Sequence, residues 1–326
     1  MSSILDQVVT VGVESTYGTA QTSTVRSYEA KADTFTRDVE YIQSVGMRRD
    51  LQTIRSDRDD TITLGATGSI EFGHLNKGAG LILQHVLGST SGPPPQGSTA
   101  AYRSTFPPAD TGPTGSYTVQ ISRVDSGGTL RPFTYEGCVA TGFNIAQDLG
   151  SNLSFTLNFD AENEQTSTGE ATPSYPSSAD PFNYTNCVIA IDGSAATNFT
   201  SFSLDGDLGM DTARRFLNGS ATKSQPKRSS VPSYTGTITA EFADLTDFNK
   251  FINGTEFSIN ASWNGAEIAT GYNYEAVLSI PVAKFTGSTP VASLDSLTTV
   301  DLPFVVLDNG SSAAITMTYT STDTSL

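Results

Sequence analysis

Most of the chain alternates apolar residues with serine, threonine or charged residues. The clearest alternating segments are 116–124, 153–160, 200–206, 234–242 and 314–321. A period of two is that of a strand with one buried face, because successive side chains of a strand point to opposite sides of the sheet. The pattern therefore predicts a mainly β protein built from antiparallel sheets.

Two segments instead have apolar residues at helical spacing. The first helix is predicted over about 74–87, with apolar residues on one side and Gly88 as its end. The second is predicted over about 244–253, with an acidic first turn and Gly254 as its end. Glycine commonly follows the last turn of a helix because it adopts the left-handed conformation at little cost.

Each predicted helix follows a strand of the same kind, which indicates an internal repeat. The two strands read T-G-S-I-E-F at 67–72 and T-G-T-I-T-A-E-F at 235–242. Their glycines, Gly68 and Gly236, are 168 positions apart (236 − 68), close to half of the 326 residues. A spacing of half the chain is what a tandem duplication would produce.

The expected division is an N-terminal arm at 1–26, a first β unit at 27–175 and a second β unit at 176–326. The Pro- and Ser-rich stretch around 172–181 favours the boundary between the units. Each unit is expected to be an antiparallel β-sandwich or partial barrel with one short flanking helix. Such units have open sheet edges, so we expect them to close into a ring β-barrel on oligomerisation.

The segment 11–22, V-G-V-E-S-T-Y-G-T-A-Q-T, has no recognised counterpart in the second half. Its polar character indicates an arm added to the repeated unit. We expect it to pack along a neighbouring subunit through Glu14, Tyr17 and Gly18, with Tyr17 as the anchor, because a tyrosine buries a large ring at an interface.

Charge excludes one class of partner. The chain has 34 acidic and 18 basic residues, a net charge of −16 and a pI near 4.4, which argues against a surface that grips nucleic acid. Much of the positive charge lies in two polar stretches, one ahead of each repeated strand. Those residues are Arg37, Arg48, Arg49, Arg55 and Arg58 in the first stretch, and Arg214, Arg215, Lys223, Lys227 and Arg228 in the second.

The two cysteines, Cys138 and Cys187, form no C-x-x-C pair and are too few for a disulfide framework. Neither a signal peptide nor an apolar run long enough to span a bilayer is recognised. We therefore expect synthesis in a cytoplasm, with no membrane partner.

No enzymatic motif is complete. His74 and His85 lie on the first predicted helix without an acid or cysteine at the spacing of a metal site. The P-loop-like run at 73–80 has Ala79 and Gly80 where lysine and a hydroxyl residue are needed. We predict no catalytic residue, no metal and no cofactor.

The succession of segments along the chain resembles a known family. The segment 11–22, S-V-G-M-R-R-D at 44–50, G-L-I-L-Q-H-V-L-G at 80–88 and D-P-F-N-Y-T-N-C-V-I-A-I-D-G at 180–193 are similar to the major tail tube proteins of long-tailed, siphovirus-like bacteriophages. The resemblance implies a virion structural protein whose rings stack into a hollow tail tube that conducts DNA into the host. It also implies tail tip, tape measure and tail terminator proteins as partners.

The charge pattern fits that role. A lumen lined by carboxylates and hydroxyls lets DNA pass without specific binding, because like charges repel. The basic stretches would then contact an adjacent ring, although exposed charges are also often merely solvated. The candidates for contacts between rings are Arg48, Arg49, Arg55, Arg58, Arg214, Arg215, Lys227 and Arg228. A duplicated chain favours a trimeric ring with pseudo-sixfold symmetry, and a hexamer is the alternative.

A second function from another class is a β-sandwich adhesin or carbohydrate-binding module. Such a module needs exposed aromatic rings on which sugars stack. The single tryptophan, Trp263, and the twelve tyrosines are the candidates for that role.

Overall fold

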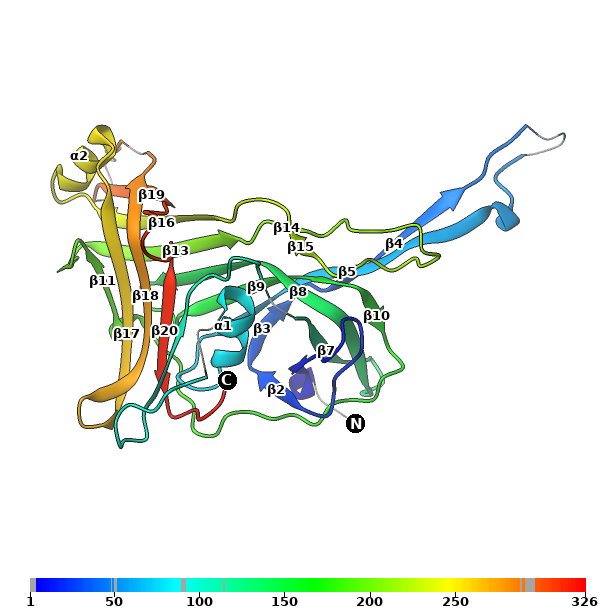
Figure 1. The fold of residues 1–326 in the computed structure, drawn as a ribbon, viewed down its shortest axis with the longest axis horizontal. Helices are drawn as coiled ribbons and strands as arrows, with labels where there is room; N and C mark the ends of the chain where they lie inside the picture. The colour runs from blue at the N-terminus through cyan, green and yellow to red at the C-terminus, as the bar shows by residue number, and fades with distance from the viewer. Residues whose placement is uncertain are drawn as a thin grey trace.

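Figure 1 shows the protein as a computed structural model, a β-rich molecule from which one long hairpin projects. The structure describes residues 4–47, 49, 52–88, 92–113, 115–287, 289–290 and 297–326.

The first half contains ten strands among its described residues: β1 (Val8–Val13), β2 (Val25–Tyr28), β3 (Ala30–Asp33), β4 (Thr36–Gln43), β5 (Asp59–Gly73), β6 (Tyr102–Phe106), β7 (Tyr117–Val124), β8 (Leu130–Asp148), β9 (Ser154–Ala161) and β10 (Asn163–Gln165). The described residues of the second half contain β11 (Cys187–Ile191), β12 (Ser194–Ala195), β13 (Phe199–Asp207), β14 (Met210–Asp211), β15 (Lys227–Arg228), β16 (Ser233–Glu241), β17 (Phe257–Ala269), β18 (Tyr272–Phe285), β19 (Thr299–Val306) and β20 (Thr316–Ser321). The helices are α1 (Gly80–Leu87) and α2 (Thr246–Asn253), with short 3-10 turns η1 (Ile4–Asp6), η2 (Ser56–Arg58) and η3 (Tyr184–Asn186). This composition confirms the mainly β, antiparallel fold.

The strand pairings of the first half recur in the second half. In the first half β1 pairs with β2 and β7, β7 with β8, β8 with β9 and β10, and β5 with β9 and with β3 and β4. In the second half β11 pairs with β12 and β17, β17 with β18, β18 with β19 and β20, and β16 with β19 and β13. The two sets of pairings follow the same order, as a tandem repeat should.

The register of the two halves agrees as well as the order. Gly68 lies opposite Phe159 in the first half, and Gly236 lies opposite Phe304 in the second. A Cβ at either glycine would meet its neighbours at 2.4 Å or less, from Phe35 Cα at Gly68 and from the Phe304 ring at Gly236. The repeated glycines therefore mark positions where a packed aromatic residue leaves no room for a side chain.

One sheet runs through both halves because β13 pairs with β8. Its strands follow the order β3 and β4, β5, β9, β8, β13, β16, β19 and β18. One face of this sheet carries the apolar core, which includes Phe143, Phe155, Phe202 and Phe304. Strands β1, β2 and β7 form part of a separate sheet with the start of β8.

The first helix is shorter than the sequence predicted, because residues 74–79 form a loop and α1 begins at Gly80. Gly78 has a φ of +83°, and Asn76 is held by the backbone of Asp180 through bonds of 2.9 Å. These features take the chain out of helical geometry before α1. The second helix agrees with its prediction within two residues, and Gly254 ends it in the left-handed conformation.

The segment predicted to be an N-terminal arm forms part of a sheet of its own chain. Residues 8–13 form β1, which lies between β2 and β7 of the same chain, and β1 has β11 as its counterpart in the second half. The valines of this strand, Val8, Val9 and Val11, are buried. The sequence pattern missed the strand because its partner β7 is far away along the chain and the polar residues after Val13 dominate the segment.

Candidate lumen face and assembly surfaces

The face of the long sheet that points away from the core is polar. On β13 the side chains of Leu204 and Phe202 are buried, so Ser201, Ser203 and Asp205 point to the other face. The same alternation holds on β8, β9, β16 and β19. We call this surface the polar face. Its exposed acidic residues on these five strands within the long sheet are Asp148, Asp205, Asp207, Glu241 and Asp301, whereas Asp160 of β9 points the same way but is buried.

Within the long sheet, which β8 joins from Val139 on, no lysine or arginine occupies an outward position on these five strands, which the structure describes throughout. Arg131 lies at the start of β8, in the separate sheet with β7. The remaining outward residues are mainly serine, threonine and asparagine. Two of the carboxylates accept hydrogen bonds from polar neighbours: Asn144 Nδ2 donates to Asp205 at 2.8 Å, and Thr239 Oγ1 donates to Asp301 at 2.8 Å. The polar face therefore presents fixed negative charge beside hydroxyl and amide groups.

The hairpin of β4 and β5 extends far beyond the body of the molecule (Figure 1). Four large apolar side chains near its end are more than half exposed, which is unusual so far from a core: Tyr41, Ile42, Val45 and Met47. Exposed apolar surface of this kind commonly marks a contact with another protein. The sequence analysis singled out only the basic residues of this region, although the run Y-I-Q-S-V-G-M contained the signal.

The basic residues predicted in the hairpin are exposed where the structure describes them. Arg48 lies outside the described residues, and Arg49 and Arg58 are exposed. The Arg55 guanidinium donates to both carboxylate oxygens of Asp57, at 2.7 and 2.6 Å.

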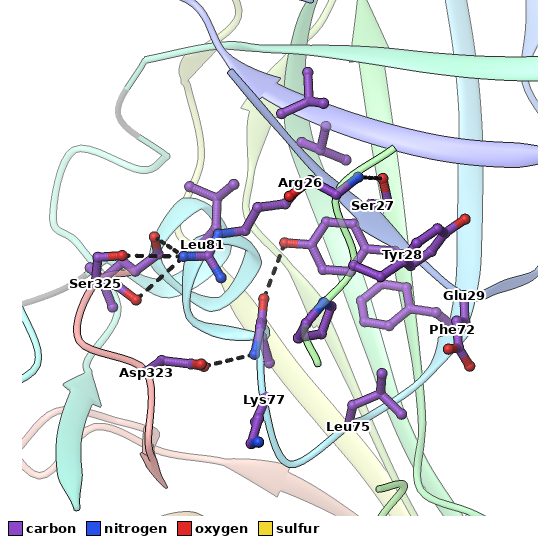
Figure 2. A pocket seen from close by; sticks show the side chains of 18 of the residues that line it. Arg26, Ser27, Tyr28, Glu29, Phe72, Leu75, Lys77, Leu81, Asp323 and Ser325 are labelled. Carbon is purple, nitrogen blue, oxygen red and sulfur yellow. Dashed lines mark hydrogen bonds between the residues drawn. The ribbon is translucent and has the colours of Figure 1, made fainter. Parts of the chain in front are cut away.

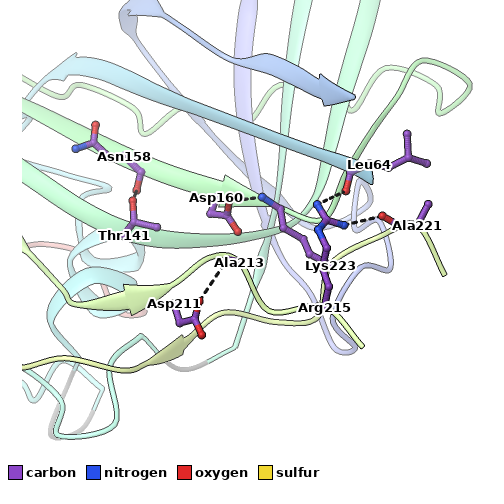
Figure 3. Close-up of polar contacts among 9 residues, drawn as sticks. All are labelled: Leu64, Thr141, Asn158, Asp160, Asp211, Ala213, Arg215, Ala221 and Lys223. Atoms are coloured by element: carbon purple, nitrogen blue, oxygen red, sulfur yellow. Dashed lines mark hydrogen bonds and ion pairs between the residues drawn. The ribbon is translucent and has the colours of Figure 1, made fainter. Parts of the chain in front are cut away.

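The basic residues of the second stretch lie against their own chain. Arg214 donates to the carbonyl of Gln225 at 2.6 Å. Arg215 donates to the carbonyls of Ala221 at 2.6 Å and Leu64 at 3.3 Å (Figure 3). Guanidiniums bound to carbonyls in this way hold the loop in place.

The remaining two basic candidates lie on β15, of which Lys227 is exposed. Arg228 donates to the carbonyls of Leu208, Ala109 and Asp110 at 3.1, 2.7 and 3.0 Å. The structure thus gives the two basic stretches different surroundings, and their contact with another ring stays a prediction.

A buried ion pair joins this loop to the first unit. The Lys223 ammonium contacts the carboxylate of Asp160 on β9, and the two side chains are 6% and 1% exposed (Figure 3). Burial raises the pKa of Asp160 to about 6, although the lysine acts in the opposite direction. Thr222 also donates to Glu162 at 2.9 Å, and the amide of Leu64 donates to the carbonyl of Ala221 at 2.9 Å. We call residues 210–228, fixed by these contacts, the docked loop.

The three residues predicted for the arm make their observed contacts within one chain. Glu14 is buried and accepts hydrogen bonds from Ser116 Oγ at 2.5 Å, from Thr118 Oγ1 at 2.9 Å and from the amides of Gly18 and Gly137 at 3.0 and 2.9 Å. The Tyr17 ring lies against Gly137, where a Cβ would come within 2.9 Å of it. Burial and nearby carboxylates raise the pKa of Tyr17 above its usual value. These contacts tie the turn after β1 to the first unit.

A cavity of about 480 Å³ lies beside the start of α1 (Figure 2). Several of its polar groups bind one another: Tyr28 donates to the Gly78 carbonyl at 3.3 Å, the Gly78 amide donates to Asp323 at 2.7 Å, and Arg26 donates to the Leu326 carbonyl at 2.7 Å. These bonds join the C-terminal segment to the first unit, so the cavity lies at a seam between the two halves.

The two histidines occupy apolar surroundings. His74 precedes α1, whereas the sequence predicted it within the helix, and His85 lies in α1. Burial lowers the pKa of His74 to about 4 and that of His85 to about 3. Among the described residues no group of three or more His, Cys, Asp or Glu is placed to hold a metal ion. None of the helices in the described part of the chain has the length and apolar character needed to cross a bilayer.

Trp263, the main candidate for a sugar-stacking residue, is fully buried. Its indole nitrogen donates to Gln147 Oε1 at 3.0 Å, across the boundary between the two halves. A ring in this position is part of the core, so the structure does not favour the carbohydrate-binding alternative.

The long sheet, its acidic face and the projecting hairpin define a β-structural subunit with surfaces suited to assembly. A family model described as phage tail tube protein matches residues 5–306, and the chain belongs to that family. It is therefore a structural protein of the virion tail. No curated protein matches the sequence.

Proposed function

We propose that this protein assembles into rings, that the rings stack into the hollow tail tube of a siphovirus-like phage, and that the polar face lines the lumen. The observation that carries the proposal is the outward surface of β8 from Val139 on, β9, β13, β16 and β19, which has carboxylates and hydroxyls and no lysine or arginine. Fixed negative charge repels phosphate, so DNA can move along such a lining without binding.

The repeated strand pairings support the proposed stoichiometry. Each chain supplies two units of the same topology, joined side by side through β8 and β13. Three chains then supply six units, which gives a trimer with pseudo-sixfold symmetry. A hexamer of chains is the alternative, and it would supply twelve units, twice the number that pseudo-sixfold symmetry requires.

We further propose that the hairpin contacts the adjacent ring. Its exposed apolar residues would be buried there, and Arg49, Arg55 and Arg58 would meet acidic surface of that ring. Because the docked loop occupies the equivalent place in the second unit, each trimer would present three hairpins instead of six. The ends of the tube would meet the tail tip and tail terminator proteins, the tape measure protein would occupy the lumen before ejection, and synthesis would take place in the host cytoplasm.

The lumen assignment is tested by reversing charge on the polar face. We expect Asp205→Lys with Asp207→Lys to leave tube formation intact, because both side chains point away from the core, and to make purified tubes retain short fluorescent DNA at low salt. Glu267→Lys with Glu256→Lys, on β17 and beside it, is the matched control with the same change in charge. Equal DNA retention by both variants would contradict the proposal that the polar face lines the lumen.

The hairpin assignment has a separate test. We expect Arg49→Glu, Arg55→Glu and Arg58→Glu together to leave the mass of a single ring unchanged and to shorten the tubes at least tenfold in electron micrographs. Arg131→Glu is the control, because Arg131 pairs with Asp125 within its own hairpin at 2.9 Å. Tubes of normal length in the triple variant would contradict a role in stacking, and a ring mass of six chains would contradict the trimer.

A further inference from the structure

The buried ion pair of the docked loop leaves polar atoms without partners. Lys223 Nζ donates to Asp160 Oδ1 (Figure 3), and no other acceptor of this ammonium is found within the described residues. Asp160 Oδ2 is buried and likewise lacks a hydrogen-bond partner there. Two charges removed from water are stabilised only where further hydrogen bonds satisfy their remaining protons and lone pairs. These surroundings therefore favour an uncharged product of the same two side chains.

The backbone on both sides of Lys223 is held in place. Thr222 forms a parallel β-bridge with Leu64 of β5. On the other side, the Ser224 amide donates to the Arg214 carbonyl at 2.9 Å. Two groups that one fold holds in contact react as if each were present at a very high concentration, up to about 10⁵ to 10⁸ M for well-oriented pairs. The docked loop thus presents the lysine to the carboxylate as a reactant.

Gly65 of β5 makes room for the lysine side chain. A Cβ at Gly65 would come within 2.8 Å of Lys223 Cε and 3.2 Å of its Nζ. Gly65 lies opposite Asp38 on β4, and Thr67, two residues further along β5, lies opposite Asp160 on β9. Residues two apart on a strand, and residues directly opposed across strands, share one face of the sheet. The lysine therefore packs on a face that carries one carboxylate on each strand beside β5.

We propose that Lys223 and Asp160 condense to an isopeptide bond, which joins the docked loop covalently to β9. A proton first passes from the ammonium to the carboxylate, which gives a neutral amine and a carboxylic acid. The amine lone pair then forms a bond from Nζ to the Asp160 Cγ, and the bond from Cγ to its hydroxyl oxygen breaks. The hydroxyl leaves as water with a proton from the attacking nitrogen, so the step needs no oxidant and no other reactant. The product is a secondary amide with one N–H, one carbonyl and no charge.

The charges around Asp160 act on the group that is attacked. Burial raises the pKa of Asp160 to about 6, Asp38 acts in the same direction, and Lys223 and Arg215 act against it. A higher pKa favours the carboxylic acid, whose hydroxyl can leave as water, over the carboxylate. Desolvation also favours a neutral lysine, which is the nucleophilic form of an amine. Asp38 is thus a positioning residue that acts through the charge of its carboxylate.

The ion pair is the state before the reaction, so newly folded chains contain it and the isopeptide bond accumulates in the folded protein. Lys223 and Asp160 are 63 positions apart. A covalent bond that closes such a loop stabilises a fold by restricting the unfolded chain. The proposal concerns a single chain and does not depend on the proposed ring or tube.

Mass spectrometry of the full chain in denaturant tests the bond directly. We expect wild-type protein that has been kept folded for several days to be lighter than its sequence mass by one water molecule. A protease digest should then contain a branched peptide that joins residues 160 and 223. Lys223→Arg keeps the positive charge, but its guanidinium stays protonated and does not attack, so this variant should keep its full mass. Lys223→Met with Asp160→Asn, which keeps the volume of the pair, should also keep its full mass.

Two results would overturn the bond. One is a wild-type chain that retains its full mass after the same storage, a result that needs no variant to fold and leaves the tail tube function standing. The other is a loss of water that persists in Lys223→Arg. That loss would indicate cyclisation at an aspartate before a glycine, such as Asp205 before Gly206, instead of an isopeptide bond.

The role of Asp38 has its own measurement, the rate at which the lighter species appears. We expect Asp38→Asn to slow the reaction about threefold or more, because the neutral amide no longer favours the protonated form of Asp160. Asp38→Glu keeps the charge and should restore the rate, which a purely structural role in packing would not predict. Equal rates in Asp38→Asn and the wild type, with the same thermal unfolding, would overturn the role of Asp38.

Discussion

The two helices occupy the same place in the repeated order of strands, yet their burial is opposite. Seven of the eight residues of α1 are buried, and none of α2 is. The sequence of α1, G-L-I-L-Q-H-V-L, is apolar on almost every side, whereas T-D-F-N-K-F-I-N of α2 has one apolar side. A helix that is apolar all round requires cover on all sides. The repeated units thus share their topology but not their neighbours.

The connections ahead of β5 and β16 differ in the same way. In the first unit this connection is the projecting hairpin, and in the second it is the docked loop, tied to β9 and β5 by Lys223, Thr222 and Arg215. The two connections occupy equivalent places in the recurring order of strands, yet one faces outward and the other holds the two units together. Variants that change one helix, or one of the two connections, therefore compare the contribution of each unit to stability.

The largest effect is expected at the buried ion pair of the docked loop. Removing one partner leaves a charge buried without compensation, so Lys223→Ala should lower the free energy of unfolding by about 3 to 5 kcal/mol at pH 8. Chemical denaturation followed by circular dichroism would measure the loss. Arg55→Ala in the hairpin, where the ion pair with Asp57 is exposed on both sides, should change it little.

The cause of that loss can be separated from the loss of the lysine stem. Lys223→Met with Asp160→Asn keeps the volume and removes both charges, and it should recover most of the stability. Limited proteolysis should then cut residues 210–228 faster in Lys223→Ala than in the double variant. An equal loss in both variants would show that the uncompensated charge of Asp160 is not the cause of the loss in Lys223→Ala.

The helices give the next largest contrast. Leu83 in α1 is 1% exposed, so Leu83→Ala should lower the free energy of unfolding by about 2 to 5 kcal/mol through lost burial and a cavity. Ile252 in α2 is 60% exposed, and Ile252→Ala should cost less than about 0.5 kcal/mol in the monomer. Denaturant titration of both variants measures the difference. Equal losses would mean that α2 is covered in the isolated chain.

The sequence predicted those features that rest on local pattern. The alternation of apolar and polar residues predicted the antiparallel β fold, and Gly254 predicted the end of α2 within one residue. The repeat was recognised from Gly68 and Gly236, which the paired registers place at equivalent positions. Each of these signals lies within a few neighbouring residues, where side-chain periodicity and glycine conformation act directly.

Features that depend on distant partners were missed or misplaced. The sequence analysis predicted an arm where β1 lies, because β7, which pairs with β1, lies far along the chain. The polar face could not be assigned, because it needed the pairing of β8 with β13 across the two halves. Arg214, Arg215 and Arg228 were grouped with the hairpin arginines by charge alone, whereas their carbonyl partners are set by the path of the docked loop.

The last contrast concerns pH and again separates the helices, because α1 carries a histidine and α2 does not. His85 Nε2 accepts a hydrogen bond from the Ala140 amide at 3.0 Å, which requires the unprotonated ring, and burial lowers the pKa of His85 to about 3. Below pH 6.5 the unfolded chain binds a proton that the folded chain refuses, so His85 makes the free energy of unfolding fall by up to about 1.4 kcal/mol per pH unit between about pH 6.5 and 3.

Replacing the imidazole isolates this contribution from the other titrating groups. His85→Gln offers an acceptor that does not titrate, so we expect its stability to vary less between pH 7 and pH 5 than that of the wild type. Asp160, whose pKa is raised to about 6, gives a contribution of opposite sign between about pH 4 and 6, because the folded chain then binds the extra proton. That contribution is present in both proteins and cancels in the comparison. Parallel pH profiles for the two proteins would show that His85 accepts its proton in the folded state as readily as in the unfolded one.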